Sequence, residues 1–215
     1  MSHVIVTRFA VPRPEGNTAS AFRDPDWLAE RHGLFRRFFV PSVARLGIPV
    51  KLLCGREVAG AVAERVSDLP WAEVVEQDDW RGGWTGSVEQ TVTRLDSDDA
   101  VHPDWFDAVH RAPAAAPASI TGRSLRLDLA SGHLQHYRRR EPAPLAAFRR
   151  GANPYAVDHK HLARLPGIHW IRGPHLLQVV HGGNVSNRRP KRWRVDRWAS
   201  RTRLAEFGLA DPVAG

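Results

Sequence analysis

Cysteine and long hydrophobic runs are both scarce in this sequence of 215 residues. The single cysteine, Cys54, has no second cysteine with which to form an internal disulfide, and a cysteine-rich zinc site is excluded. Apolar runs such as 4–6 and 176–180 are far shorter than the roughly 20 residues that a membrane-spanning helix needs. The N-terminus also lacks the charged leader and apolar core of a signal peptide. We therefore expect a cytoplasmic protein in which Cys54 is a buried strand residue.

Most of the net positive charge lies in one segment near the C-terminal end of the sequence. The formal net charge is +8, and residues 188–203 hold eight Arg or Lys against one Asp, so the rest of the chain carries +1 (8 − 7). A basic segment of this kind binds nucleic acid, an anionic membrane surface or a phosphorylated substrate, or it forms an ordinary solvated surface. We predict an α/β domain over residues 1–187 and a basic C-terminal segment over 188–215. Docking of this segment on anionic lipid would make the protein peripheral at the inner face of the membrane.

The spacing of apolar residues predicts strands that alternate with helices. Strands are expected at 4–6, 49–54, 72–76, 91–95 and 176–181. Helices are expected over 25–43, 57–69 and 103–111, the first capped by Asp24 and kinked or split at Pro41. Residues 120–129 and 133–137 favour a hairpin. This alternation predicts a single α/β domain with a mixed, mostly parallel sheet flanked by helices.

An acidic cluster follows the fourth predicted strand. Asp96, Asp98 and Asp99 place three carboxylates within four residues, and their repulsion is unfavourable unless a cation or an arginine offsets it. Mg²⁺ and Mn²⁺ prefer oxygen ligands, and Mg²⁺ is usually held by one or two carboxylates together with substrate phosphates. The cluster therefore predicts a metal site for a diphosphate, with Arg94 two residues ahead of it. The alternative is a solvated turn in which Asp98 or Asp99 caps the helix that begins near Pro103.

A second polar segment follows the last predicted strand. His181 ends that apolar strand, and residues 182–187 supply two glycines, two asparagines and a serine. Glycines allow a ligand to approach the backbone closely, and ligands of open α/β sheets bind beyond the carboxyl ends of the strands. We therefore predict that His181 completes a Mn²⁺ or Mg²⁺ site with Asp96 and Asp98, and that Asn184 contributes to binding. Alternatively, His181 is a structural histidine and Asn184 a turn residue.

Four segments together resemble a rhamnosyltransferase family of bacterial glycosyltransferases. In chain order they are Thr7-Arg8-Phe9, Pro41-Ser42-Val43, the run Thr-Arg-Leu-Asp-Ser-Asp-Asp at 93–99, and Gln-Val-Val-His-Gly-Gly-Asn-Val-Ser-Asn at 178–187. The two long segments are specific as a pair, and together the four segments extend over most of the chain. The resemblance implies a glycosyltransferase A-type nucleotide-binding fold with a metal-binding Asp-x-Asp motif.

The same resemblance implies a nucleotide-sugar donor, for which the family name suggests rhamnose, and a saccharide or lipid-linked acceptor. Asp96 and Asp98 match the metal and diphosphate motif, Asp99 the adjacent acidic position, and His181 the later histidine. In such a reaction, a metal ion neutralises the negative charge that develops on the nucleoside diphosphate as it leaves.

Other side chains are candidates for contacts with the donor and the acceptor. Arg8 and Arg94 are expected to pair with phosphates, because a guanidinium binds them bidentately; the alternative for each is a structural arginine that satisfies the aspartates. An inverting reaction needs a carboxylate base near the acceptor hydroxyl, and Asp158 and Asp79 are the candidates, although such residues more often lie at surface or capping positions. Trp80 and Trp84, in a glycine-rich loop, are candidates for stacking on a sugar or base, although packing in the core explains most of the eight tryptophans.

Two functions outside the transferases fit some of the same features. Cations and aromatics are interleaved over residues 188–198, as in nucleic-acid-binding proteins, and an acidic metal site beside them is compatible with a metal-dependent nuclease. In a nucleic-acid-binding protein, Asp96→Ala would leave the affinity for nucleic acid unchanged. In a nuclease, the same substitution would abolish cleavage but not DNA binding. A glycosyltransferase would instead lose metal-dependent binding of a nucleoside diphosphate. We favour the glycosyltransferase, with nucleic acid as the less favoured partner.

Overall fold

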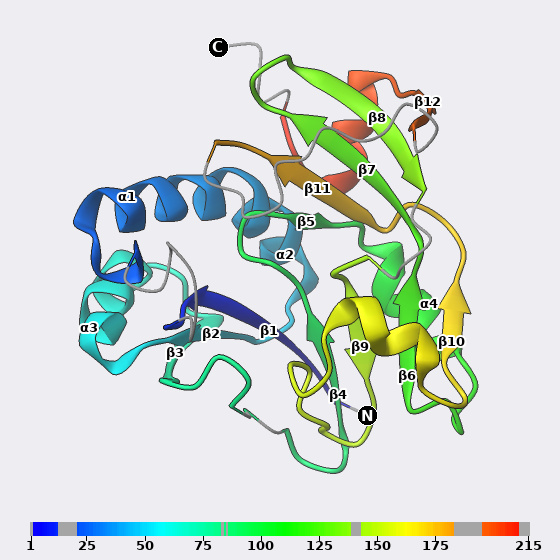
Figure 1. Ribbon diagram of the computed structural model, residues 1–215, viewed down its shortest axis with the longest axis horizontal. Helices are drawn as coiled ribbons and strands as arrows, with labels where there is room; N and C mark the ends of the chain where they lie inside the picture. Colours follow the sequence, from blue (N-terminus) through cyan, green and yellow to red (C-terminus); the bar gives the residue numbers. More distant parts are fainter. Residues whose placement is uncertain are drawn as a thin grey trace.

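The computed structural model describes residues 2–12, 21–82, 84, 86–138, 143–182 and 195–210. Its larger sheet has seven strands in the order β10-β6-β9-β4-β1-β2-β3 (Figure 1). In chain order these are β1 (Ser2–Ala10), β2 (Val50–Cys54), β3 (Ala72–Glu76), β4 (Gln90–Arg94), β6 (Ala118–Thr121), β9 (Ala146–Phe148) and β10 (His169–Ile171). β9 is antiparallel to both of its neighbours, and the other adjacent strands are parallel. The predicted mixed, mostly parallel sheet is confirmed.

β1 lies in the interior of this sheet because its residues suit a strand that is covered on both faces. Val4, Ile5 and Val6 are at most 2% exposed, as expected for a β-branched run in a parallel sheet. β1 pairs in parallel with β2 on one side and with β4 on the other. Cys54, at the end of β2, is buried as expected, and its burial raises the pKa of the thiol to about 12.

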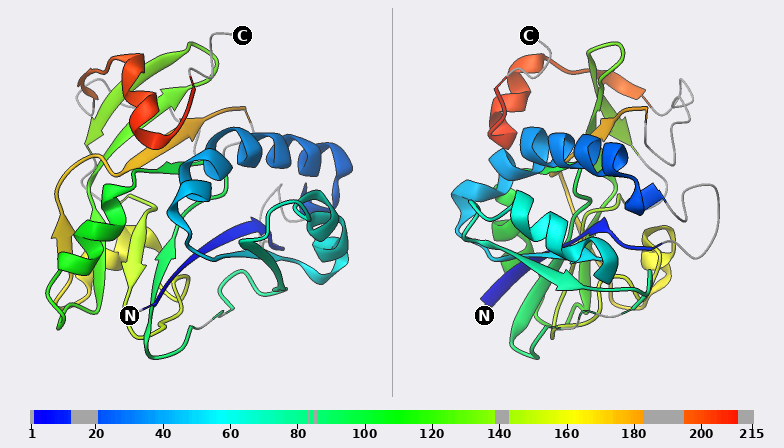
Figure 2. Two further views of the ribbon diagram at one scale, coloured as in Figure 1. Left: turned by 180° about the vertical axis from the view of Figure 1, so that it is seen from behind. Right: turned by 90° about the vertical axis from the view of Figure 1, so that its left-hand side faces the viewer.

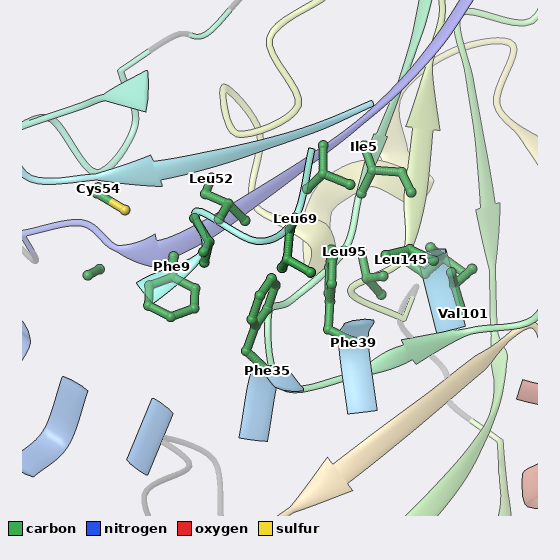
Figure 3. Packing of buried hydrophobic residues seen from close by; sticks show 14 of the residues in the cluster. Ile5, Phe9, Phe35, Phe39, Leu52, Cys54, Leu69, Leu95, Val101 and Leu145 are labelled. Carbon is green, nitrogen blue, oxygen red and sulfur yellow. The ribbon is translucent and has the colours of Figure 1, made fainter. Parts of the chain in front are cut away.

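Helices cover one face of the larger sheet. They are α1 (Pro25–Leu34), the π-helical turn η2 (Phe35–Phe39), α2 (Val40–Val43), α3 (Arg56–Arg65) and α4 (Asp104–Arg111), with the 3-10 turns η1 (Ala21–Arg23) and η3 (Ala44–Leu46). Phe35 and Phe39 extend from η2 into the main hydrophobic cluster, where Phe9 of β1 and Leu52 of β2 also lie (Figure 3). The flanking helices predicted from the sequence are therefore present, and their apolar side chains fill the core.

The first helix begins as predicted and changes its winding before Pro41. Asp24 caps α1, with its carboxylate accepting a hydrogen bond from the backbone N–H two residues later. Pro41 has no N–H with which to continue an α-helical ladder. Just before it, the N–H of Val40 donates to the carbonyl of Phe35, which is the wider spacing of a π-helix. The irregularity expected at Pro41 thus takes the form of a widened turn.

A second sheet, which the sequence analysis did not predict, has five strands in the order β12-β8-β7-β11-β5. They are β5 (Ala100–Val101), β7 (Arg123–Asp128), β8 (His133–Arg138), β11 (Leu176–Val180) and β12 (Val195–Trp198). β7 and β8 form the predicted hairpin. The strand expected over 120–129 is in fact two strands, because Ile120 belongs to β6 in the larger sheet.

Part of the predicted basic segment 188–215 belongs to this second sheet. β12 pairs with β8, and the 3-10 helix η6 (Arg201–Phe207) lies against the sheet (Figure 2). Leu204 and Phe207 of η6 share a hydrophobic cluster with Leu34 and Phe38. Residues 188–194 lie outside the described residues. None of the described helices combines the length and hydropathy needed to cross a bilayer.

The acidic segment connects the two sheets. It follows β4 in the larger sheet and precedes β5 in the smaller one. β11 runs antiparallel beside β5, with Leu177 opposite Ala100. Because His181 follows β11, this pairing carries the histidine past the start of β5 and toward the aspartates. The two polar segments singled out from the sequence therefore meet at the junction between the sheets.

Candidate functional site

Asp98 and His181 are in contact at this junction. The Nε2 atom of His181 lies 2.9 Å from Oδ2 of Asp98, and the two side chains are 8% and 7% exposed. The same carboxylate oxygen forms an ion pair with Nη1 of Arg31, on α1, at 3.0 Å. The other ring nitrogen of His181, Nδ1, lies 3.7 Å from Oε1 of Glu30. The centre of the site is thus a histidine between two carboxylates, with an arginine on the buried one.

Asp98 and Asp99 are adjacent but have opposite electrostatic environments. Oδ1 of Asp99 accepts a hydrogen bond from the N–H of Val179 at 2.9 Å. Burial, together with the charges of Asp98 and Asp96, raises the pKa of Asp99 well above its ordinary value. Burial also opposes ionisation of Asp98, but Arg31 and the neighbouring histidine outweigh it and lower the pKa of that carboxyl. Asp98 therefore supplies the negative charge of the pair.

Asp96 is separate from the Asp98–His181 contact. Its backbone carbonyl accepts a hydrogen bond from the N–H of Asp99 at 3.1 Å, which forms a turn. Its side chain is half-buried and makes no hydrogen bond or ion pair with another described residue. Among the described residues, no group of three or more His, Cys, Asp or Glu side chains could hold a metal ion. The predicted set of Asp96, Asp98 and His181 is therefore not assembled as three ligands; two of the three are in contact.

Arg8 lies at the carboxyl end of β1 between two aromatic rings. Its guanidinium carbon is 3.6 Å from the ring centroid of Trp80 and 4.2 Å from that of Tyr155. Its Nη1 donates to the carbonyl of Trp80 at 3.3 Å. The hydroxyl of Tyr155 accepts from the N–H of Arg8 and donates to the carbonyl of Val6, both at 3.2 Å. One face of the Trp80 ring, a predicted stacking surface for a sugar or base, is therefore covered by Arg8.

The strand register places Arg8 beside the acidic segment. Val6 of β1 pairs with Arg94 of β4, so two residues further along Arg8 lies level with Asp96. The hydroxyl of Ser97 donates to the carbonyl of Arg8 at 3.4 Å. A fixed guanidinium and a half-buried carboxylate thus occupy neighbouring strand ends, at the edge where ligands of α/β sheets bind.

Arg94 has a structural role rather than an open phosphate-binding one. Its Nε donates to the carbonyl of Pro144 at 3.1 Å, and its Nη1 donates to those of Pro154 and Val157 at 2.9 and 3.2 Å. Arg94 is 3% exposed, and burial lowers its pKa. These contacts fasten the segments that precede and follow β9 to the sheet. Of the two alternatives for Arg94 the structure favours the structural one, although its acceptors are carbonyls and not aspartates.

The two candidate catalytic bases lie in exposed loop positions. The carboxylate of Asp79 accepts a hydrogen bond from the N–H of Arg81 at 2.9 Å, in the loop after β3. Asp158 occupies the N-cap position of the 3-10 helix η4 (His159–Arg164), and its side chain makes no capping hydrogen bond. Both positions are typical of the capping and surface alternatives, and the role of either as a base stays a prediction. Asn184 lies outside the described residues.

Three residues of the site were not predicted from the sequence: Glu30, Arg31 and Tyr155. Glu30 and Arg31 lie on α1, more than sixty positions before the acidic segment, and helical periodicity marks only the apolar face of a helix. The one signal for Arg31 was indirect, since three neighbouring carboxylates require a cation. The sequence offered Arg94 for that purpose because it is close along the chain, whereas the fold supplies an arginine from another element.

The Asp98–His181 pair is compatible with a divalent ion. Adjacent ligands of an octahedral ion with bonds of about 2.1 Å lie about 3 Å apart, and the two atoms here are separated by 2.9 Å. Carboxylate and imidazole are both ligands that Mn²⁺ accepts. Because Arg31 also lies on Asp98, the protein offers such an ion few ligands, and the rest would come from the substrate or from Asp96.

No family model matches this chain, and no curated protein matches it. Among solved structures, the chain is similar to S. aureus TarS 1–349 with 12% identity and a TM-score of 0.41, over 83% of this chain and 60% of that one. It is also similar to HddC from Yersinia pseudotuberculosis, complexed with GMP-PN, with 12% identity and a TM-score of 0.40, over 83% of this chain and 89% of that one. Similarities at this level establish neither a family nor a function.

Proposed function

We propose that this protein is a glycosyltransferase that uses a nucleotide-sugar donor. The observation that carries the proposal is the contact between Asp98 and His181, which are 83 residues apart in the chain. These residues belong to the two long segments of the family resemblance, and they meet beyond the carboxyl ends of β4 and β11. Ligands of open α/β sheets bind at such strand ends. Rhamnose is the proposed sugar, and a saccharide or lipid-linked molecule is the proposed acceptor.

In this proposal the donor diphosphate lies near Asp98 and Arg8. Asp98 and His181 would hold Mn²⁺ or Mg²⁺, which when bound neutralises charge on the departing nucleoside diphosphate. The rings of Trp80 and Tyr155 fix the plane of the Arg8 guanidinium, so its N–H groups have little freedom to lose when they bind an anion. A fixed cation at this position would stabilise the leaving group without reorganisation.

The proposal is tested by calorimetric titration of the protein with UDP, GDP and dTDP, each with Mn²⁺ and with EDTA. We expect one nucleotide to bind only with the metal, and Asp98→Asn to weaken that binding by about tenfold or more. Asp107→Asn, at an exposed position on α4, is the matched control and should bind as the wild type does.

Three results would contradict parts of the proposal. A folded wild-type protein that binds none of the nucleotides would remove the glycosyltransferase assignment and bring nucleic acid forward as the partner. Equal affinity in Asp98→Asn and wild type would remove Asp98 from the site. Transfer of a sugar other than rhamnose from the bound nucleotide would overturn the donor sugar and leave the reaction class intact.

A further inference from the structure

We propose that Arg31 is a diphosphate-binding residue, with its guanidinium bridging Asp98 and the phosphate oxygens of the nucleotide-sugar. The inference rests on the proposed function and extends it to a residue on α1 that no motif of the sequence marks. Arg31 reaches the site from a helix, whereas Arg8 reaches it from a strand end. Two arginines from different elements would then approach the same anion.

The hydrogen-bonding capacity of Arg31 is largely unused. A guanidinium has five N–H donors, and the only ion pair that Arg31 forms with a described residue joins Nη1 to one oxygen of Asp98, at 3.0 Å. Its Nε is buried and has no hydrogen-bond partner among the described residues. A buried unpaired N–H costs about 1–3 kcal/mol, so such groups in native proteins usually have a purpose.

Arg36, on the same helical segment, shows what a purely structural arginine does here. Its Nε donates to His32 at 3.1 Å, and its two terminal nitrogens donate to Asp68 and to the carbonyl of Arg65. All three of its nitrogens are therefore paired. Arg31 is less exposed, at 18% against 29% of the side chain, yet only one of its nitrogens has a partner among the described residues. The structural Arg94 also keeps one buried nitrogen, Nη2, without a partner among the described residues, so it is the position of Arg31 on Asp98 that points to a ligand as the missing acceptor.

The geometry of the guanidinium indicates a diphosphate. Nη1 is held by Asp98, which leaves the edge formed by Nε and Nη2 for a second acceptor. That edge presents two parallel N–H groups, an arrangement that binds two oxygens of a phosphate side-on. The ion pair with Asp98 fixes the position of the group before a ligand arrives. Since Asp98 also contacts His181, the diphosphate would lie against the residues proposed to hold the metal.

The test measures binding of inorganic pyrophosphate and of UDP, GDP and dTDP to wild type, Arg31→Ala, Arg31→Lys and the control Arg37→Ala. Arg37 is exposed on η2, so Arg37→Ala removes the same charge at a position outside the site. We expect Arg31→Ala to weaken binding of pyrophosphate and of the accepted nucleotide by about tenfold or more. Arg31→Lys keeps the charge beside Asp98 but lacks the side-on edge, so its binding of pyrophosphate and nucleotide should weaken less than that of Arg31→Ala. Because the charge is kept, Arg31→Lys should fold even where the alanine variant does not.

The outcomes separate this inference from the proposed function. Wild-type binding of pyrophosphate but of no nucleotide, lost in both Arg31 variants, would sustain the anion site and overturn the glycosyltransferase assignment. Nucleotide binding that is unchanged in Arg31→Ala would overturn the inference alone. If the Arg31 variants lose binding of the nucleotide and of the phosphate-free nucleoside to the same extent, the inference is also overturned. A substitution that acts only through the fold would weaken binding of both ligands equally.

Discussion

At the scale of single residues, Asp98 and Asp99 show how neighbours in the chain acquire different chemistry. Asp98 is paired with Arg31 and His181 and has a lowered pKa. Asp99 is buried against Val179, next to the charge of Asp98, and has a raised pKa. The sequence alone presents two similar carboxylates. Their difference arises from the elements that pack against each of them.

This difference predicts opposite responses to the same substitution. Asp99→Asn should keep the hydrogen bond from Val179, because an amide oxygen also accepts, and should not lower the free energy of unfolding at neutral pH. Asp98→Asn should lower that free energy by about 3 kcal/mol, since it leaves Arg31 without its countercharge. Urea unfolding of both variants at pH 7 measures the two effects.

The Asp99 variant also has a predicted pH dependence. In the wild type, the folded-state pKa of Asp99 lies above the unfolded value of about 3.9. Stability from such a group is complete below the unfolded pKa and is lost as the pH rises through the folded pKa. Asparagine does not titrate, so the advantage of Asp99→Asn over wild type should grow between pH 4 and pH 8. A difference that stays constant with pH would show that Asp99 ionises normally.

The residues that the sequence identified share one property, which is their position in a recognisable local pattern. Asp98 and His181 follow apolar strands, so topology alone brings them toward one edge. Arg31 belongs to no local sequence pattern, because only tertiary packing brings it into contact with Asp98. Arg94 illustrates the opposite error: proximity along the chain suggested a partner for the aspartates, but its side chain leaves the site for the loop carbonyls.

At the scale of elements, His3 connects β1 to β4 and α4. Its Nε2 lies 2.8 Å from the hydroxyl oxygen of Thr93, and its Nδ1 lies 3.2 Å from Nε2 of His110. Its ring packs edge-on against Phe106 with centroids 4.9 Å apart. Burial, together with the charge of His110, lowers the pKa of His3 from 6.5 to about 3. The junction of these three elements is therefore built around a neutral imidazole.

A neutral buried histidine predicts instability in acid. Because the folded pKa lies below the unfolded one, the stability that His3 contributes is present above pH 6.5 and is lost as the pH falls toward 3. The loss is of the order of 5 kcal/mol over that interval. His3→Phe keeps the aromatic packing and removes the titration, so its deficit relative to wild type at pH 7 should shrink or reverse at pH 4. Parallel pH profiles of unfolding for the two proteins would contradict this account.

The elements themselves were predictable where local chemistry determines them. Asp24 caps α1, and the β-branched run at 4–6 lies in β1, as expected. The boundary between β6 and β7 was missed because only Gly122 separates the two strands, and apolar periodicity does not distinguish the sheets. β5 has only two residues, which is too short for any periodic signal.

At the scale of the whole molecule, the two sheets form one structure through elements that span both. The acidic segment joins them covalently, and the segment from α1 to η2 contributes to both hydrophobic clusters. Phe35 and Phe39 lie in the cluster of the larger sheet, whereas Leu34 and Phe38 lie with η6 in the cluster of the second sheet. The sequence did not predict this arrangement, because it does not show that two faces of one helical segment pack against two different sheets. It places Arg31 on the element that both sheets hold.

If this segment couples the two hydrophobic clusters, a destabilising substitution in the cluster of the second sheet should make the buried residues of the larger sheet more accessible to reagents. Phe207 is fully buried in the second cluster, and Phe207→Ala should lower the free energy of unfolding by about 3–5 kcal/mol. Cys54 is fully buried in the larger sheet, so its thiol reacts with reagents only when that sheet opens. With a tenfold change for each 1.4 kcal/mol, Phe207→Ala should speed the labelling of Cys54 by about a hundredfold or more.

The labelling experiment distinguishes one cooperative structure from two independent ones. Val88 is 76% exposed, and Val88→Ala is the control that should leave the labelling rate unchanged. If Phe207→Ala destabilises the second sheet but Cys54 remains as protected as in the wild type, the two sheets open separately. Arg31 and Asp98 would then lie at a boundary between units of different stability. If the rates rise together with the loss of unfolding free energy, the site lies inside a single cooperative unit, which would keep Arg31 and Asp98 positioned for an incoming anion.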